Sequence, residues 1–336
     1  MGSPILRYEA GQTPYPFEAL TSTDNLTFSS SFAPWSNAAG AEPVVSPYGL
    51  LTGGAVTVNT GTDHSVSVAT LTAMMPGAAG ASATTGIRSV TGGNLAALRA
   101  TTSPGSVDQT HAITSLTVDD AGTLAAVAGV EGLAFSETRG AAGGPPYIPV
   151  GSIEIGQVRR VGRGDAEVTA GEIYTVPNLH VEFANYPVYD INYATGEVVF
   201  AAELPLIHTA DAPKLVYARG STPLFAPLGK VSDWVPAEST YSITSTDTYD
   251  GPVGSATSSL GQASFTAQLV DGITDSFLLQ KGKTVWMEFR PDRDKLLPKM
   301  LTQGVLGVSR AFPAGGGSFS ASCTVTPSVE SLDVRS

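Results

Sequence analysis

Alternation of apolar and polar residues dominates the last third of the chain. Between Gln262 and Leu269, alanine, phenylalanine and leucine occupy every second position, with glutamine, serine and threonine between them. Successive side chains of a strand point to opposite faces of a sheet, so this pattern predicts a strand with one buried face and one hydroxyl and amide face. We predict further strands in this region over 238–249, 284–289, 304–312 and 318–325.

Two connections in this region are predicted from their capping and turn-forming residues. Asp271 can cap a short helix, Asp275 lies near the positive end of that helix, and Gly282 ends it. Residues 250–261 are rich in glycine, serine and threonine, and they predict a long flexible loop. A loop of this length inside a folded domain is usually functional or mobile.

Residues 48–220 show the same alternation in shorter bursts, separated by turn-forming residues. Many short strands at this spacing predict an antiparallel sandwich or barrel, which would form a second β-rich domain. The predicted strands are 55–58, 65–68, 113–118, 153–158, 188–191, 197–200 and 214–217. Only 71–75 and 94–100 have a helix-like pattern, and the glycine- and proline-rich stretch 141–146 predicts a long loop.

Residues 1–47 combine frequent prolines with aromatic residues. Their six prolines exclude a long helix or a central strand, because proline lacks the amide hydrogen that both require. We therefore predict an irregular N-terminal arm, either poorly ordered or with its aromatic side chains inserted into a neighbouring subunit. The chain thus divides into an arm over 1–47, a β-rich additional domain over 48–220 and a core domain over 221–336.

Composition and charge narrow the classes of function. Of the 336 residues only 14% are charged, and the formal net charge is −12. Nucleic-acid binding by phosphate neutralisation is not expected, because it needs clustered Lys and Arg. The single cysteine, Cys323, alternates with apolar residues, which predicts a buried, inert thiol and excludes an intrachain disulfide. With no secretory signal and no long apolar run, we expect folding in a reducing cytoplasm.

No arrangement of residues predicts catalysis, a metal site or a cofactor. The four histidines are scattered without metal-ligand spacing, and there is no nucleophile elbow or phosphate-binding loop. The close carboxylate pairs that could serve glycoside hydrolysis are Asp119 with Asp120, Asp271 with Asp275, and Asp292 with Asp294. Each pair falls in a predicted turn or helix cap, where carboxylates have structural roles, so we do not expect an enzyme.

The order of strand, helix, strand, hairpin and small-residue strand after residue 261 resembles the C-terminal core of tail tube proteins from long-tailed, non-contractile bacteriophages. It is most similar to the major tail proteins of siphophages with Mu-like transposable genomes. The matching stretches are 261–267, 270–275, 289–293 and 310–315, with 135–146 and 204–209 further upstream. The resemblance implies a structural protein of the virion tail with a tail-tube β-sandwich or barrel core.

Tail tube proteins pack as homohexameric rings that stack into a tube, through which the viral DNA passes during ejection. The resemblance implies further copies of this chain and the tape measure, tail terminator and distal tail proteins as partners, with assembly in the host bacterial cytoplasm. It implies no specific DNA binding and no membrane. The loop that reaches a stacked ring in this family corresponds here to Asp250, Gly251, Pro252, Gly254 and Ser258.

The polar face of the predicted C-terminal strands is the candidate lining of such a tube. Hydroxyl and amide groups offer DNA no strong binding site, and acidic groups repel it. The candidate lumen-facing residues are Gln262, Ser264, Thr266, Gln268, Glu288, Asp292 and Asp294, with the polar positions 318, 320, 322 and 324 beside them. The same polar face would suit a strand exposed to outer solvent. The alternative function is a receptor-binding tail fibre or adhesin module, and an enzyme ranks third.

Overall fold

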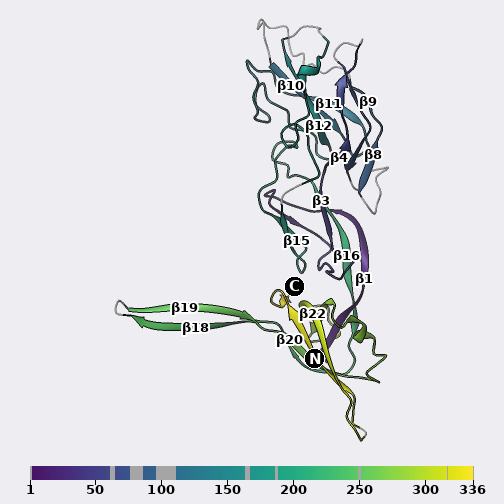
Figure 1. The fold of residues 1–336 in the computed structure, drawn as a ribbon, viewed down its shortest axis with the longest axis vertical. Coiled ribbons are helices and arrows are strands. Elements are labelled where there is room, and N and C mark those ends of the chain that lie inside the picture. Colours follow the sequence, from purple (N-terminus) through teal and green to yellow (C-terminus); the bar gives the residue numbers. More distant parts are fainter. Residues whose placement is uncertain are drawn as a thin grey trace.

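The chain folds mainly into β-strands, as the alternation predicted. The computed structural model describes residues 2–60, 65–75, 86–95, 111–162, 167–185, 188–248, 251–315 and 317–335. Within these ranges the strands form several antiparallel sheets, and the only helices are two short 3-10 helices, η1 (Ala170–Glu172) and η2 (Ser276–Gln280). The largest described sheet has nine strands and does not close into a barrel. The molecule is elongated, and one long hairpin leaves it sideways (Figure 1).

The nine-stranded sheet holds the C-terminal strands together with the N-terminus. In spatial order it contains β17 (Val231–Val235), β20 (Ala263–Gln268), β23 (Ser320–Pro327), β22 (Lys299–Ala311), β21 (Thr284–Arg290), β1 (Ile5–Ala19), β16 (Val216–Pro227) and β3 (Val44–Pro47), while β24 (Leu332–Val334) pairs with β22. The strands predicted from residue 262 onward are therefore confirmed as β20, β21, β22 and β23. We call the part of the sheet from β17 to the start of β1, with η2, the body.

The body encloses one hydrophobic core because its sheet curls. Leu6, Phe265, Met287 and Leu306 come from four different strands and pack into a single cluster. The amide of Leu228 donates to the carbonyl of Leu6 at 2.9 Å, so the chain that leads into β17 lies against β1. Since side chains alternate along a strand, burial of these residues leaves the polar residues of the same strands on the outer face.

The prediction of an irregular arm is wrong for residues 5–19, which form strand β1 of the large sheet. Only Ile5–Tyr8 pairs with β21, whereas pairing with β16 runs from Arg7 to Ala19. Pro14 and Pro16 therefore lie where β1 has one partner strand, and a register shift between Tyr15 and Glu18 accommodates Pro16. Proline is tolerated at an edge or a bulge, because no ladder hydrogen bond is lost there.

The aromatic residues of the N-terminal segment pack inside their own chain. Phe28 and Trp35 are 0% exposed, and they share a cluster with Phe200. This cluster covers a small sheet of β14 (Tyr189–Asn192), β15 (Glu197–Phe200) and β2 (Thr27–Ser29). The indole of Trp286 in the body donates to the carbonyl of Trp35 at 2.7 Å. The segment thus joins the body to this middle unit, and the predicted boundary at residue 220 falls inside β16.

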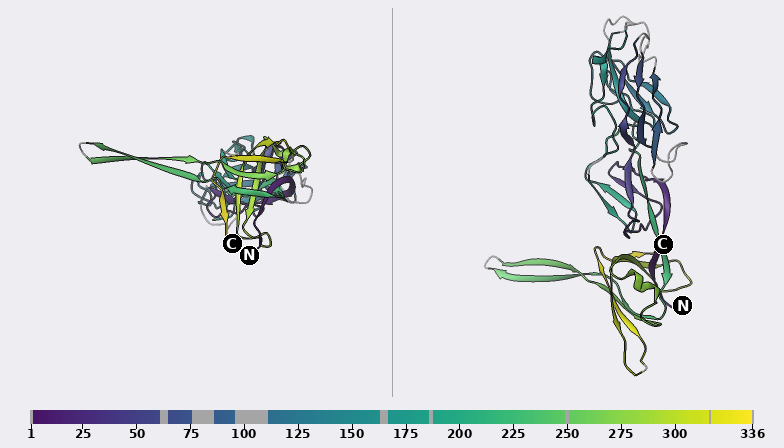
Figure 2. Two further views of the ribbon diagram at one scale, coloured as in Figure 1. Left: turned by 90° about the horizontal axis from the view of Figure 1, so that it is seen from below. Right: turned by 45° about the vertical axis from the view of Figure 1, so that its right-hand side comes forward.

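Residues 48–185, which we call the upper block, form three further small sheets (Figures 1 and 2). The first has β4 (Gly49–Gly53), β7 (Leu71–Met74) and β8 (Ile87–Val90); the second has β5 (Val56–Val58), β6 (Val66–Val68) and β9 (Gly93–Leu95); the third has β11 (Leu124–Ala128), β10 (His111–Val118), β12 (Ile153–Val161) and β13 (Ile173–Tyr174). They share one core that includes Leu71, Leu116 and Ile153. The second β-rich region is therefore confirmed as β structure.

The two predicted helical pieces of the upper block are corrected. Residues 71–74 form β7, because Leu71 and Ala73 both enter the core at every second position. Residues 94–95 belong to β9, and 96–100 lie outside the described residues. The burial periodicity of a packed sheet overrides the weak helical preference of leucine, methionine and alanine.

The predicted helix after Asp271 begins later than expected and is a 3-10 helix. The carboxylate of Asp271 accepts from the amides of Ile273 and Thr274, both at 2.7 Å, and Asp275 accepts from the amide of Gly272 at 2.9 Å. Gly272 has a φ of 75°, which a helix excludes. The two carboxylates therefore cap a turn, and the helical residues start only at Ser276.

The predicted loop over 250–261 is instead a strand of the long hairpin. β18 (Ser239–Thr248) and β19 (Gly251–Leu260) pair along their whole length, from Ser239 opposite Leu260 to Thr248 opposite Gly251. The hairpin pairs with no other described strand and extends away from the body (Figures 1 and 2). Glycine and serine suggested a loop, but backbone pairing with β18 holds residues 251–260 in a regular antiparallel ladder.

Candidate functional site

The outer face of the body carries a patch of hydroxyl side chains on three adjacent strands. Thr266 of β20 lies opposite Ser322 of β23, which lies opposite Ser309 of β22. One step along, Ser264 lies opposite Thr324. The register thus brings the predicted polar residues of separate strands into one row across the sheet. We call these five residues, with Gln262, Gln268 and Thr326, the hydroxyl face.

The hydroxyl face has no charged side chain among its members. Its polarity follows from the alternation, because the residues between them, such as Phe265, Ala321 and Cys323, are buried in the body core. Gln262 donates from its side-chain amide to the hydroxyl of Thr326 at 3.0 Å, which ties β20 to β23 at the surface. Cys323 is buried as predicted, and burial raises the pKa of its thiol to about 12.

Glu288 does not contribute to this face, which corrects the prediction. Its side chain is 1% exposed and lies on β21, where it accepts from Arg7 and Arg290 at 2.8 Å and meets Lys299 at 3.3 Å. Burial opposes the charged carboxylate, but hydrogen bonds from Arg290 and Arg7 keep the pKa of Glu288 below its usual range. Three cations surround one carboxylate, so this corner of the body is basic.

Asp292 and Asp294 also lie outside the hydroxyl face. They occupy the connection between β21 and β22, where the amide of Asp294 donates to the carboxylate of Asp292 at 3.2 Å. The neighbouring amide of Arg293 donates to the carbonyl of Ser3 at 3.1 Å. Asp292 thus stabilises a turn beside the N-terminus, as the carboxylate of Asp119 does in the β10–β11 turn, accepting from Thr123 at 2.7 Å.

The hairpin exposes large apolar side chains on one of its faces. Tyr241 is 74% exposed and Ile243 is 78% exposed, and they lie opposite Ser258 and Ala256 on the partner strand. The candidate inter-ring residues Gly251, Pro252, Gly254 and Ser258 all belong to β19, and Asp250 lies outside the described residues. A two-stranded hairpin is marginally stable at best in water, so a partner that covered this face would stabilise it.

A second exposed apolar patch, which the sequence did not reveal, surrounds the β22–β23 connection. Phe312 and Phe319 meet edge to face with ring centroids 5.6 Å apart. Val270 and Ile273 of the preceding loop are 87% and 75% exposed. The guanidinium of Arg310 donates to the carbonyl of Gly272 at 2.7 Å and fixes this loop against β22. Apolar residues gathered in this way are typical of a contact surface.

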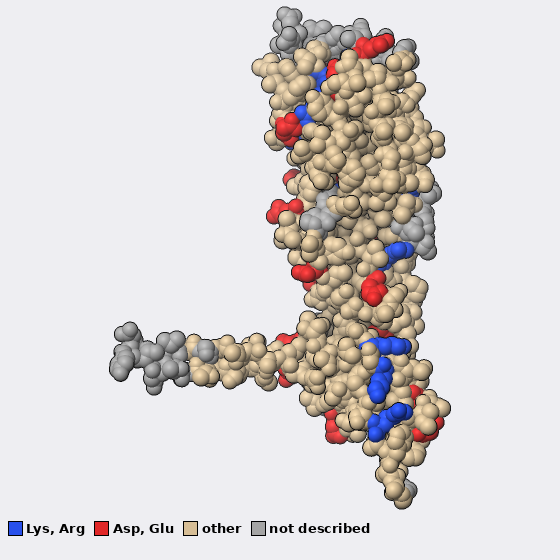
Figure 3. Space-filling view, in the orientation of Figure 1, with Lys and Arg blue, Asp and Glu red and all other residues tan. Residues whose placement is uncertain are grey.

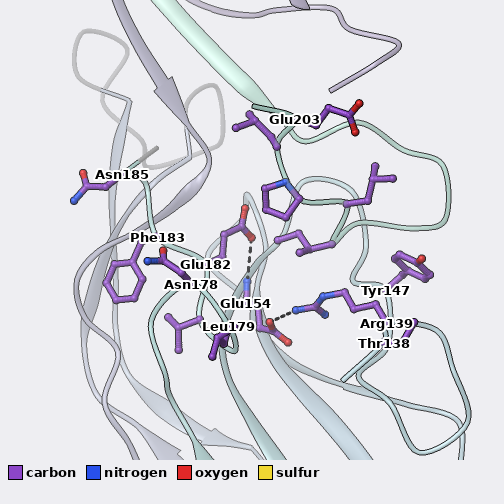
Figure 4. A pocket seen from close by; sticks show the side chains of 15 residues that line it. Thr138, Arg139, Tyr147, Glu154, Asn178, Leu179, Glu182, Phe183, Asn185 and Glu203 are labelled. Carbon is purple, nitrogen blue, oxygen red and sulfur yellow. Dashed lines mark hydrogen bonds and ion pairs between the residues drawn. The ribbon is translucent and has the colours of Figure 1, made fainter. Parts of the chain in front are cut away.

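The upper block contains a pocket of about 730 Å³ at its junction with the chain that follows β15. Figure 4 shows Arg139 and Tyr147 on one side of the pocket, Phe183 and Asn178 across from them, and Glu154 and Glu182 between. Apart from Glu154 on β12, the described lining residues lie in connections between strands. Sequence reasoning missed this pocket because its walls come from segments up to 69 residues apart, Thr138 and Ile207 being the extremes.

Two buried ion pairs form the floor of the pocket and the layer behind it. The guanidinium of Arg139 pairs with Glu154 and donates to the carbonyl of Pro146 at 2.8 Å. Lys214, which is completely buried, pairs with Glu182. Burial raises the pKa of Glu154 and lowers that of Lys214. Each acid has a basic partner, so the floor is neutral overall whether a proton resides on the lysine or on the carboxylate.

The described histidines occupy separate environments. His208 is fully buried, with Nε2 3.0 Å from the carbonyl of Ser152, whereas His180 lies against Arg159 at 3.1 Å. His111 packs edge to face on Phe135, and His64 lies outside the described residues. Among the residues that the structure describes, no three metal-ligating side chains gather, and no helix is long and apolar enough to span a bilayer.

No protein-family model matches the chain, and no curated protein matches it.

Charged side chains are sparse over most of the face shown in Figure 3, including the described part of the hairpin. The hydroxyl face, the hairpin and the pocket are therefore the features from which function is inferred.

Proposed function

We propose that this chain is a structural virion protein, the major tail protein of a long-tailed, non-contractile bacteriophage, which polymerises as stacked hexameric rings into a tail tube. The hairpin β18–β19 is the observation that carries the proposal. It pairs with no other described strand, and Tyr241 and Ile243 are each more than 70% exposed. Contact with another copy of the chain would bury these side chains and support a ladder that is marginal alone.

A contact through an extended arm explains how copies would form a filament. The arm and the surface that receives it are different parts of the molecule, so each copy offers one of each. Such heterologous contacts either close into rings or continue as open filaments, depending on the rotation between copies. In stacked rings, the contacts within each ring close on themselves, and the contacts between rings continue as a filament.

The hydroxyl face is the proposed lining of the tube. Serine, threonine and glutamine side chains offer a moving DNA duplex hydrogen-bonding groups without a fixed positive charge. The basic corner around Glu288 would lie away from the lumen. There, β21 is covered by the segment that contains Trp35, whose carbonyl accepts a hydrogen bond from the indole of Trp286. The tape measure, tail terminator and distal tail proteins are proposed partners on the strength of the sequence resemblance alone.

Negative-stain electron microscopy of the concentrated protein tests this proposal. We expect hollow tubes or six-fold rings from the unmodified chain. Replacing residues 241–258 with Asn-Gly joins Thr240 to Ser259, which already lie opposite each other, and retains a two-residue turn. This variant should fold and remain a single copy. A chain that stays a discrete globule at every concentration overturns the proposal.

A matched pair of hairpin variants separates the two faces of the hairpin. Tyr241→Thr with Ile243→Thr removes the apolar face and should abolish assembly. Thr240→Ser with Ser242→Thr alters the opposite face conservatively and should leave assembly intact. Equal assembly by both variants would exclude the apolar face as the contact.

A further inference from the structure

The pocket of the upper block has the size and chemistry of a small-molecule site. Its volume of about 730 Å³ lies within the range of roughly 300–1,000 Å³ that such sites occupy. None of its lining residues belongs to the hairpin or to the hydroxyl face. The pocket belongs to the upper block and the chain that follows β15, whereas the hairpin leaves the body (Figure 1).

The floor of the pocket favours a neutral ligand. The side chains of Glu154 and Glu182 are 2% and 1% exposed, and each is already paired with a basic residue, Arg139 or Lys214. An added anion would meet two carboxylates, and an added cation would meet the guanidinium. Either ion would lose its hydration, and the floor has no unpaired group of opposite charge to replace it. Such a loss is costly in a buried site.

The walls of the pocket combine apolar surfaces with hydrogen-bonding groups. Leu179 is 70% exposed and Leu206 is 46% exposed, and they lie with Tyr147 and Phe183 around the opening. Asn178 and Asn185 add amides, which both donate and accept. A ligand that fills the pocket therefore needs apolar faces as well as several hydroxyl or amide groups.

We propose that this pocket binds a neutral saccharide, either free or as a unit of a surface glycan. A sugar ring presents apolar C–H faces to aromatic and leucine side chains and a rim of hydroxyls to amides and paired carboxylates. An extended peptide fits less well, because the lining residues outside β12 lie in connections and offer no free strand edge for main-chain pairing. The proposal does not depend on tube assembly, since the pocket lies within one chain.

Saturation-transfer NMR with the full-length chain tests the proposal. The probes are neutral di- and trisaccharides of hexoses, 6-deoxyhexoses and N-acetylhexosamines, with a sialylated and an amino-sugar oligosaccharide as charged comparisons. We expect transfer to at least one neutral probe at up to about 10 mM, where a site of millimolar affinity is filled. Tyr147→Ala and Asn178→Ala should each weaken binding about tenfold, as expected when one good contact is lost.

Two control variants make the result specific. Leu133→Ala changes a residue that is 78% exposed and does not line the pocket, so binding should be unchanged. Glu167→Gln removes an exposed carboxylate outside the pocket and should leave the affinity for neutral probes within twofold. Each variant is checked for an unchanged thermal transition, and a pocket variant that unfolds is replaced by Tyr147→Phe or Asn178→Ser.

Three outcomes would overturn the proposal. The first is the absence of transfer to every neutral probe. The second is a preference for the sialylated or amino-sugar probe. The third is equal binding by the pocket variants and by Leu133→Ala. Binding of unstructured peptides at the pocket in place of sugars would likewise reject it and point to a protein partner.

Discussion

The upper block and the body place their buried charges differently. In the upper block, Arg139 and Glu154 are paired inside the domain, next to a pocket. In the body, the buried carboxylate of Glu288 on β21 meets three cations, whereas the core is apolar and the hydroxyl face has no charged member. Buried ion pairs cost desolvation free energy and fix the geometry of the side chains around them. A surface of hydroxyl groups needs little desolvation and binds charged partners weakly. Under the two proposals above, saccharide recognition belongs to the upper block, and the hydroxyl face of the body is a passive lining.

Removing one partner of a buried ion pair should produce the largest effect. Lys214→Met leaves Glu182 buried without its cation, and we expect the upper block to lose about 3–5 kcal/mol of stability. Chemical denaturation measures this loss. Combining it with Glu182→Leu should recover much of the stability, because the uncompensated charge is gone. The exposed Lys230→Met serves as the control in the body and should change stability by less than about 0.5 kcal/mol.

The two regions should also lose stability in different pH windows. His208 is buried against Ser152 of the upper block, and burial lowers the pKa of its ring. The folded state therefore favours the neutral ring. The unfolded chain then binds more protons below about pH 6.5, and stability falls as the pH drops through that range. The pKa of Glu288 in the body is lowered, so its contribution is complete above about pH 4.3 and is lost only at more acidic pH.

Hydrogen exchange, corrected for intrinsic rates, can follow the two windows separately. Between pH 7.5 and about pH 5.5, below the usual histidine pKa, protection should fall in β12 and remain constant in β21. His208→Gln together with His180→Gln should remove most of the change in β12, because burial also lowers the pKa of His180, which lies against Arg159. Parallel loss of protection in both strands would contradict the assignment of separate titrating groups.

The smallest effect on folding is expected on the hydroxyl face. Ser322→Lys places a charge on an exposed position, and stability should change by no more than about 0.5 kcal/mol. If this face lines a tube, like charges would meet around each ring, and tubes should form only at raised salt, which screens the repulsion. Ser328→Lys, at an exposed position beyond the end of β23, should assemble at every salt concentration.

The sequence alone determined four strands of the body, β20 to β23, and the character of their faces. The alternation from Gln262 to Leu269 fixes which side chains are buried, because a strand has a period of two residues. The buried thiol of Cys323 and the turn after Asp119 follow from the same local rules. These features depend on neighbours within a few residues, which a sequence displays directly.

Only the tertiary structure decided how distant segments combine. β1 enters the sheet despite Pro14 and Pro16 because its partner strand lies on one side there, and 251–260 becomes a strand because 239–248 pairs with it. The pocket joins residues from Thr138 to Ile207, and Glu288 is buried because Arg7, Arg290 and Lys299 converge on it. Pairing across the chain depends on which edges and charges meet in space, and local periodicity carries no information about that.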